Sequence, residues 1–227
     1  MTVGGAVRRP RLLIMARAPV AGRTKTRLEP LLGPGGCARL QTALIRRTAA
    51  LDDGTGSLAH TPSDAAGLIR PLVGPRIRLF PQRGGDLGER MASAVRTVGV
   101  GVGAGPVIVV GTDCPVLDRT HLAGAVAALD AGHDVVLGPA HDGGYYLIGV
   151  ARPDPRVFAI PTGAWGGPEV AALTAEAVAG AGLSLGFLDP EHDLDTPADV
   201  PALLGDPRLP AAIADILRSA PDGAALT

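Results

Sequence analysis

Short apolar runs alternate along the chain with longer segments in which apolar residues recur at helical spacing. The uninterrupted runs are typical of strands buried on both faces, and they fall at 12–16, 107–110, 134–138 and 145–150. Weaker strand patterns cover 57–60, 76–80 and 183–188. Helical spacing predicts helices over 35–51, 86–98, 118–129, 168–181, 197–204 and 210–217, and a short helix that Ser63 or Asp64 caps and that ends at Ile69.

Strands that alternate with helices predict an α/β fold of three layers, in which helices cover both faces of a mostly parallel mixed sheet. The strands at 134–138 and 145–150 are joined by a short loop, which indicates one antiparallel excursion. We expect a single domain over 11–218, with a flexible leader at 1–10 and a flexible tail at 219–227.

Composition narrows the classes of function. The 227 residues are 46% apolar, enough for a sizeable core, but only 3% aromatic, so Ala, Val and Leu must fill that core. A net charge of −1 gives no electrostatic reason to expect nucleic acid or an anionic membrane as a partner. The first apolar run, Leu12–Ala16, is too short for a signal sequence or a membrane span. Cys37 and Cys114 have no metal-like spacing, and we expect a cytoplasmic protein.

A cationic loop follows the first strand. It contains Gly22, which lets the backbone approach a ligand closely, and the side chains of Arg23, Lys25 and Arg27. Positive charge at the carboxyl end of a strand suits a polyphosphate. The loop matches neither the P-loop pattern nor G-x-G-x-x-G, and a solvated surface loop is the alternative interpretation.

Asp113 follows the buried run Val107–Val110 and the turn at Gly111. Open α/β sheets bind their ligands at the carboxyl ends of such strands, so Asp113 is a candidate ligand for a metal or substrate. The alternative is structural: the carboxylate braces the turn or caps the helix that begins near Asp118.

Two more carboxylates, Asp193 and Asp195, alternate with an apolar residue just beyond the last predicted strand. Oxygen ligands of this kind suit a hard cation such as Mg²⁺. The alternative is again structural, because Asp195 or Thr196 can serve as the N-cap of a helix that has Pro197 in its first turn. One residue can also do both jobs.

Three other segments are candidates for binding. Asp142–Gly144 is an ordinary hairpin turn followed by two tyrosines, whose rings and hydroxyls border the loop, whereas His141 beside it is more typical of a surface residue than of a catalytic base. Asp86 either caps the following helix or belongs to a loop that reads a base. Trp165, the only tryptophan, either seals a hydrophobic edge or contacts substrate.

Taken together, five segments resemble the signature of the DUF2064 family, a group of GT-A-like transferases. The segments are Ala16–Leu28, Gly85–Met91, Gly111–Pro115, Asp142–Gly149 and Asp193–Asp199, and the resemblance spans roughly residues 11–204. The family is related to nucleotidyltransferases that include 2-phospholactate guanylyltransferase and molybdenum cofactor guanylyltransferase. The resemblance implies a nucleotide-diphospho-sugar transferase (GT-A) fold.

The resemblance also implies a site. Lys25, Arg27 and Asp113 would be the catalytic residues, with the Lys25/Arg27 loop against the nucleotide phosphates. Asp113 and Asp195 would share Mg²⁺ or Mn²⁺, with Asp193 beside them. The nucleotide would be bound by Ala16, Arg17, Gly22, Arg23, Lys25, Gly85, Asp86 and Thr112. A small-molecule acceptor would be bound by His141, Asp142, Gly143, Gly144, Tyr145 and Trp165. His141 and the pair Gly166–Gly167 depart from the commoner family residues, so they bear on which acceptor is used.

Two reactions fit such a site. Nucleotidyl transfer joins an NMP from an NTP to a phosphorylated or phosphonate acceptor and releases pyrophosphate. Glycosyl transfer uses a nucleotide-sugar and, if inverting, a base near the acceptor, for which Asp142 and His141 are the candidates. We favour nucleotidyl transfer, because a basic loop suits a triphosphate better than a diphosphate and no D-x-D follows the central strand. A non-catalytic nucleotide-binding protein is the third hypothesis, and the sequence is compatible with a homodimer.

Overall fold

The computed structural model describes residues 10–54, 56–99 and 105–219. At its centre is a seven-stranded sheet in the order β3-β2-β1-β4-β6-β5-β7. The strands are β1 (Arg11–Arg17), β2 (Ser57–Thr61), β3 (Arg78–Pro81), β4 (Val107–Val110), β5 (Val135–Pro139), β6 (Tyr145–Val150) and β7 (Leu185–Phe187). Strand β6 runs antiparallel to both neighbours, and the other pairings are parallel. The mostly parallel mixed sheet and the antiparallel excursion are therefore confirmed.

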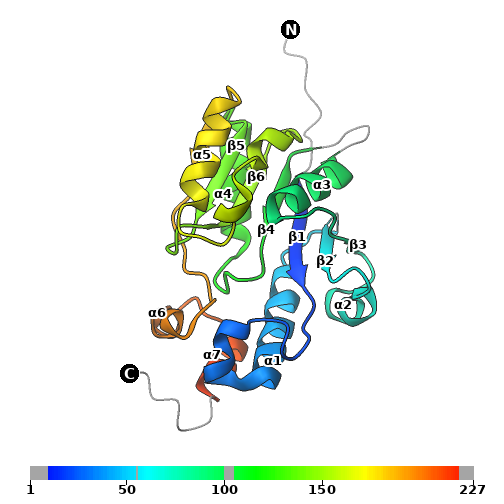
Figure 1. Ribbon diagram of the computed structural model, residues 1–227, viewed down its shortest axis with the longest axis vertical. Helices are drawn as coiled ribbons and strands as arrows, with labels where there is room; N and C mark the ends of the chain where they lie inside the picture. The colour runs from blue at the N-terminus through cyan, green and yellow to red at the C-terminus, as the bar shows by residue number, and fades with distance from the viewer. Residues whose placement is uncertain (1–9, 55, 100–104, 220–227) are drawn as a thin grey trace.

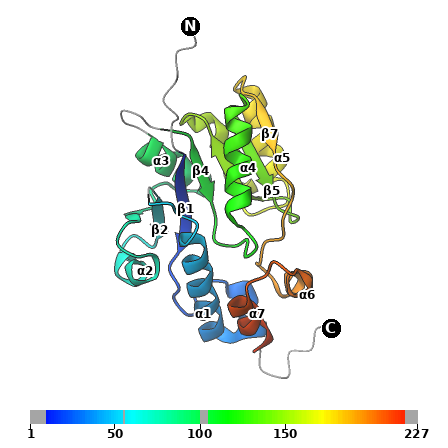
Figure 2. The ribbon, with the colours of Figure 1, turned by 180° about the vertical axis from the view of Figure 1, so that it is seen from behind.

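Helices cover both faces of the sheet, which confirms the three layers (Figure 1). They are α1 (Glu29–Ala49), α2 (Ala66–Val73), α3 (Leu87–Gly99), α4 (Arg119–Asp130), α5 (Val170–Gly180), α6 (Val200–Gly205) and α7 (Ala211–Arg218). Because side chains alternate along a strand, Leu12 and Ile14 of β1 enter the core that includes α1, α4 and α7, whereas Leu13 enters the core that includes α3. Figure 2 shows α1, α4 and α7 on the first of these faces.

Several predicted boundaries move, each for a local reason. The helix predicted from residue 35 is preceded by a turn that starts α1 at Glu29, and Gly33, with φ 65°, interrupts the helical backbone between the two parts. The cap predicted at Ser63 or Asp64 is wrong: α2 begins after Ala65, which makes no side-chain cap, and it continues past Ile69 to Val73. Strand β3 begins two residues later than the pattern predicted, at Arg78.

In the described residues, four short 3₁₀ helices connect the main elements: η1 (Thr26–Leu28), η2 (Pro155–Phe158), η3 (Thr162–Ala164) and η4 (Pro197–Asp199). The helix predicted at 168–181 starts at Val170, and the helix predicted at 197–204 divides into η4 and α6. The predicted leader and tail, apart from Pro10 and Ser219, lie outside the described residues. Within the described part of the chain, no helix is both long and apolar enough to cross a membrane.

The sheet topology brings distant loops to one edge. Strands β1 and β4 are parallel neighbours, so the cationic loop and Asp113 follow the same ends of adjacent strands. Because β6 is antiparallel to β4, with Leu147 opposite Val110, its first residues lie at this edge as well. The segment after β7 is tied to the edge by the hydrogen bond from Leu194 N to Asp113 O, 2.8 Å long.

Candidate active site

A cleft of about 630 Å³ opens at this edge of the sheet. It brings together most of the side chains predicted to form a site: Arg17, Arg23, Lys25, Arg27, Thr112, Asp113, Asp142, Gly144, Tyr145, Trp165, Asp193 and Asp195. These residues come from five separate segments of the chain. Both glycines that depart from the family pattern, Gly166 and Gly167, also line the cleft.

Lys25 lines the cleft and makes three polar contacts there. Its Nζ atom lies 2.6 Å from Asp113 Oδ1, 2.8 Å from Asp195 Oδ1 and 2.6 Å from the carbonyl oxygen of Leu194. Three acceptors match the three protons of an ammonium group. Burial by itself would lower the pKa of Lys25, but the two carboxylates more than compensate, and the pKa lies above its ordinary value. Lys25 is therefore a fixed positive charge between the two carboxylates.

The backbone at Lys25 is what turns this side chain inward. Among the described residues, Lys25 is the only non-glycine with a positive φ, 49°, a conformation that L-residues adopt at some cost. The next residues form η1, and Leu28 N donates to Lys25 O at 2.9 Å. Only 5% of the Lys25 side chain is exposed. Arg23 and Arg27, by contrast, are exposed side chains of the same loop.

Asp113 does not cap the following helix, which is one of the two structural roles that the sequence left open; within its turn, it accepts a hydrogen bond from the hydroxyl of Thr112 at 3.4 Å. The cap of α4 is Asp118, whose Oδ1 accepts hydrogen bonds from the backbone N–H groups of Thr120 and His121. Asp113 instead pairs with Lys25, and 42% of its side chain is exposed toward the cleft that it lines. Its carboxylate is thus available to a ligand.

The second structural alternative is resolved in the same way. Thr196 is the N-cap of η4, in a capping box with Asp199, so that Asp195 is not needed as a cap. Asp199 Oδ2 also accepts from Asp195 N at 2.9 Å, which fixes the backbone of Asp195. The Asp195 side chain turns to Lys25 and remains 38% exposed.

Asp193 is the unsatisfied carboxylate of the cleft. Its Oδ1 atom is buried and has no hydrogen-bond partner among the described residues. Burial raises the pKa of Asp193 well above its ordinary value, and the charges of Asp113, Asp142 and Asp195 add to the effect. A buried oxygen without a donor destabilises the folded protein, and a cation bound at this position would remove that destabilisation.

This donor set fits a magnesium or manganese ion. Carboxylate oxygens are the ligands such hard ions prefer, and Mg²⁺ commonly takes one or two carboxylates while substrate phosphates and waters complete its shell. In the described ranges, no three or more His, Cys, Asp and Glu side chains gather closely enough to form a metal cage of their own. The arrangement therefore suits a metal that shares its ligands with a bound phosphate.

Gln41, which sequence reasoning missed, braces the floor of the cleft. Its Nε2 atom donates to the carbonyl oxygen of Arg17 at 3.0 Å and to Thr112 Oγ1 at 3.1 Å, and the residue is only 2% exposed. It thereby ties α1 to the loops after β1 and β4. The one available signal was a polar residue on the buried face of α1, directly after Leu40.

Apolar and aromatic side chains also line the cleft, and we call them its apolar wall. It consists of Leu87, Met91, Tyr145, Trp165 and Val170. The ring of Trp165 packs so closely on the start of α3 that a Cβ at Gly88 would lie 2.6 Å from Trp165 Cζ2. Burial raises the pKa of Tyr145, so this tyrosine is a neutral donor and packing surface at physiological pH.

The other residues that the sequence predicted for the site are not among those that line the cleft. Ala16 is 2% exposed and belongs to the core, and Gly22 is exposed with φ 73°. The ring of His141 stacks on that of His192, with centroids 4.2 Å apart. Gly143 has φ 91° and lies so close to Pro168 that a Cβ would meet its carbonyl oxygen at 1.9 Å.

The Gly85–Asp86 turn is a helix start, the first of its two interpretations. Asp86 Oδ1 accepts from Glu89 N at 2.8 Å, and its Oδ2 accepts from the hydroxyl of Thr162 at 2.8 Å. These hydrogen bonds lower the pKa of Asp86. Both oxygens are therefore engaged in holding α3 against η3, and this turn borders the cleft without entering it.

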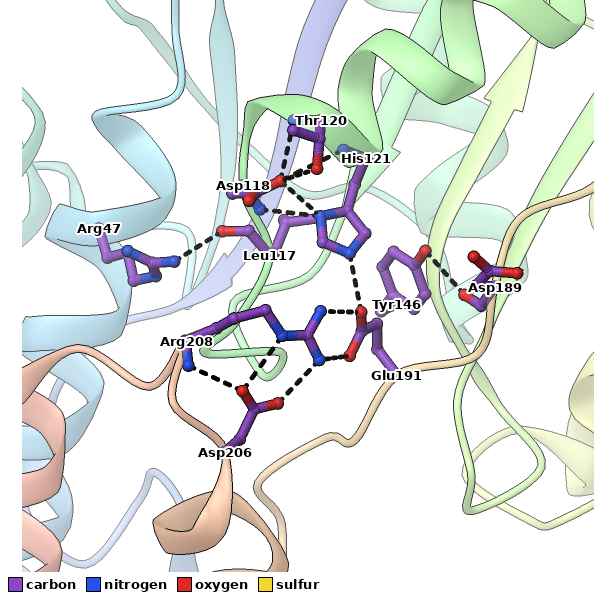
Figure 3. A network of polar contacts seen from close by, with 10 residues as sticks. All are labelled: Arg47, Leu117, Asp118, Thr120, His121, Tyr146, Asp189, Glu191, Asp206 and Arg208. Atoms are coloured by element: carbon purple, nitrogen blue, oxygen red, sulfur yellow. Dashed lines mark hydrogen bonds and ion pairs between the residues drawn. The ribbon is translucent and has the colours of Figure 1, made fainter.

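A separate polar network braces the segment that carries Asp193 (Figure 3). Glu191, 6% exposed, accepts from Arg208 Nη1 and Nη2 at 2.5 and 2.8 Å and lies 2.9 Å from His121 Nε2. Tyr146 donates to the carbonyl oxygen of Asp189 at 3.1 Å. Burial by itself would raise the pKa of Glu191, but Arg208 and His121 more than offset this and lower it. The network locks the segment to α4 and to the loop before α7.

Solved structures with the same fold include three that are informative. A protein of Desulfovibrio desulfuricans G20, provisionally described as a nucleotide-diphospho-sugar transferase, is 28% identical over 92% of this chain and 94% of its own, with a TM-score of 0.81. CMP:2-keto-3-deoxy-manno-octonic acid synthetase complexed with CTP is 14% identical over 86% of this chain and 96% of its own, with a TM-score of 0.53. Rv0371c of Mycobacterium tuberculosis H37Rv in complex with manganese is 17% identical over 88% of this chain and all of its own, with a TM-score of 0.53.

These similarities confirm the nucleotide-diphospho-sugar transferase fold that the sequence implied. A search of curated proteins finds no match. The family model described as "Uncharacterized protein conserved in bacteria (DUF2064)" matches residues 44–164, which is more than half of the chain. The chain belongs to the DUF2064 family.

Proposed function

We propose that the protein is a metal-dependent nucleotidyltransferase that joins an NMP from an NTP to a small phosphorylated or phosphonate acceptor and releases pyrophosphate. One observation carries the proposal: the cleft combines a cationic loop after β1 with carboxylates that exceed what Lys25 can neutralise. Cations suit the phosphate oxygens and carboxylates suit a divalent metal, so a metal-bound polyphosphate matches both halves of the cleft.

The chain's own residues would act by positioning and charge. Arg23, Lys25 and Arg27 would neutralise the oxygens of the transferred phosphoryl group and of the departing pyrophosphate, which is where negative charge collects in such a reaction. Thr112, held by Gln41 at 3.1 Å, would keep the loop of Asp113 in place. The acceptor would approach from the apolar wall that contains Tyr145 and Trp165.

Asp113 and Asp195, with Asp193 beside them, would hold the metal ion. When bound, Mg²⁺ or Mn²⁺ supplies charge neutralisation and orients the phosphates for in-line attack. The unpartnered oxygen of Asp193 supports this assignment. The manganese complex of Rv0371c, a protein of the same fold, supports the use of a divalent metal.

Glycosyl transfer is the second candidate, and the position of Asp142 favours it. Asp142 lines the cleft and is exposed, and its Oδ1 accepts from Gly144 N at 2.9 Å. This position supports a role for Asp142 as general base toward an acceptor hydroxyl, whereas the ring of His141 contacts that of His192. Asp142 is the base that this reaction would use.

The two reactions are separated by their products. The protein is incubated with each NTP, Mg²⁺ and a panel of phosphorylated acceptors, and pyrophosphate is measured; a parallel series contains UDP- and GDP-sugars. We expect pyrophosphate that depends on acceptor and on Mg²⁺. Consumption of a nucleotide-sugar without pyrophosphate release would replace nucleotidyl transfer by glycosyl transfer. Nucleotide binding that is indifferent to Mg²⁺ and yields no product, observed by thermal shift with and without chelator, would indicate a non-catalytic protein.

A further inference from the structure

The Lys25 ammonium occupies oxygens that the proposed metal would use. It contacts Asp113 Oδ1 and Asp195 Oδ1 and no other side-chain carboxylate within the described ranges. Its third proton is directed to the carbonyl oxygen of Leu194. Because an ammonium has three protons and no lone pair, this lysine is fully engaged and has none left for a phosphate.

Two roles therefore compete for one side chain. Lys25 cannot donate to the phosphates of a nucleotide while all three of its protons bind the protein. A divalent metal at Asp113 and Asp195, in turn, would lie beside a buried positive charge, and like charges repel strongly where burial excludes water. Both conflicts disappear if the ammonium leaves the carboxylates for the phosphates when the metal arrives.

We propose that Lys25 is a built-in counter-ion that keeps the affinity for divalent metal low until a polyphosphate draws its ammonium away, so that metal and polyphosphate bind together. The inference rests on the proposed function and specifies its ligand: a metal–polyphosphate complex rather than the free ion. Such a coupling is reciprocal: if the polyphosphate raises the affinity for the metal, the metal raises the affinity for the polyphosphate by the same factor. With this coupling, the site would bind little divalent metal in the absence of nucleotide.

The structure contains the features that the exchange requires. The side chains of Asp113 and Asp195 are 42% and 38% exposed, so incoming ligands reach the carboxylates although the Lys25 side chain is only 5% exposed. Arg23 and Arg27 line the same cleft and are exposed, which gives the polyphosphate its first cationic contacts. Lys25 also has the φ of 49° that was noted above, a costly conformation maintained while the ammonium is held by the carboxylates.

The test measures binding and involves no turnover. Isothermal titration compares Mn²⁺ alone with premixed manganese tripolyphosphate on the wild type, on Lys25→Met and on Arg23→Met, a matched loss of one positive charge from the same loop. We expect Lys25→Met to bind Mn²⁺ alone at least about tenfold more tightly than the wild type, since one nearby like charge is removed. The same variant should bind the premixed complex more weakly, and Arg23→Met should leave the affinity for Mn²⁺ within about twofold.

Lys25→Gln repeats the measurement with a neutral side chain that still donates hydrogen bonds, in case Lys25→Met does not fold. Unchanged or weaker binding of Mn²⁺ in the folded Lys25 variants would overturn the proposal, as would a tighter binding of Mn²⁺ in Arg23→Met of the same size. Either result leaves nucleotidyl transfer standing, because that function is judged by the release of pyrophosphate.

Discussion

Glu191 and Asp193 are two residues apart on one segment, and their surroundings are opposite. Glu191 is surrounded by donors from Arg208 and His121, and its pKa is lowered. Asp193 has a buried oxygen without a donor, faces three other carboxylates, and its pKa is raised well above the ordinary value. The fold thus satisfies one acid and leaves its neighbour unsatisfied.

The difference distinguishes support from function. A satisfied buried acid such as Glu191 stabilises the fold and offers nothing to a ligand. An unsatisfied acid costs stability, and such a cost is characteristic of functional sites. Glu191 and Arg208 pair with each other (Figure 3) and so hold the backbone of the segment that carries Asp193 and Asp195. Of these two aspartates, Asp195 contacts Lys25.

The largest effect on activity is expected for a substitution at Asp113 in the cleft. Asp113→Asn keeps the shape and the contact with Lys25 but removes a negative charge. We expect pyrophosphate formation to fall by about 10²–10³-fold, the range found when one preorganised electrostatic partner is lost. Circular dichroism should show a folded protein, because Asp195 and the carbonyl oxygen of Leu194 still bind the buried Lys25 ammonium. Turnover within a few-fold of the wild type would remove Asp113 from the mechanism.

In the network around Glu191, the substitution Glu191→Gln should lower the stability of the fold and leave pyrophosphate formation in the folded protein unchanged. It removes the negative charge and one of the two acceptor oxygens that His121 and Arg208 share, at a cost of about 2 kcal/mol in the free energy of unfolding at pH 7. The pKa of Glu191 is lowered by folding, so its stabilisation is present above the ordinary value of 4.5 and is lost as the pH falls through and below it.

Urea titrations at pH 7 and pH 4 measure this effect. The difference in stability between the variant and the wild type should be smaller at pH 4 than at pH 7. A difference that grows as the pH falls would mean that Glu191 does not stabilise the fold through its charge.

A smaller effect of opposite sign is expected at Asp193. Folding raises the pKa of this group, so its charged form destabilises the metal-free protein, and stability is lost as the pH rises above the ordinary value of 3.8. In the presence of chelator, Asp193→Asn should therefore be more stable than the wild type by about 1–2 kcal/mol at pH 8. The gain should vanish near pH 3.5. A variant less stable than the wild type at pH 8 would show that Asp193 is satisfied after all.

The sequence predicted the sheet well because its strands are local patterns. Val107–Val110 and Tyr145–Val150 are buried apolar runs that form strands in any α/β arrangement. Boundaries moved where one backbone position decides the outcome, as at Gly33, whose positive φ allows a turn of helix before the predicted start of α1. At Ser63 and Asp64 a cap residue was present but α2 began without it.

The site was predictable as a set of residues but not as a set of contacts. Charge and strand ends placed Lys25, Asp113 and Asp195 in one cleft. Their pairing depends on chain separations of 170 residues for Lys25 and Asp195, and no local pattern encodes a contact of that range. The Glu191–Arg208 ion pair was not predicted for the same reason. In the sequence, both residues look like ordinary surface charges, and only the fold brings them together.

The most direct test of the account is to locate the metal. A crystal of the protein with Mn²⁺ and a non-hydrolysable nucleoside triphosphate gives an anomalous peak for the manganese ion. We expect one peak, coordinated by Asp113, Asp195 and phosphate oxygens, with the Lys25 ammonium bound to a phosphate. Nucleotide bound in the cleft with manganese elsewhere, or with Lys25 still between the two carboxylates, would contradict it.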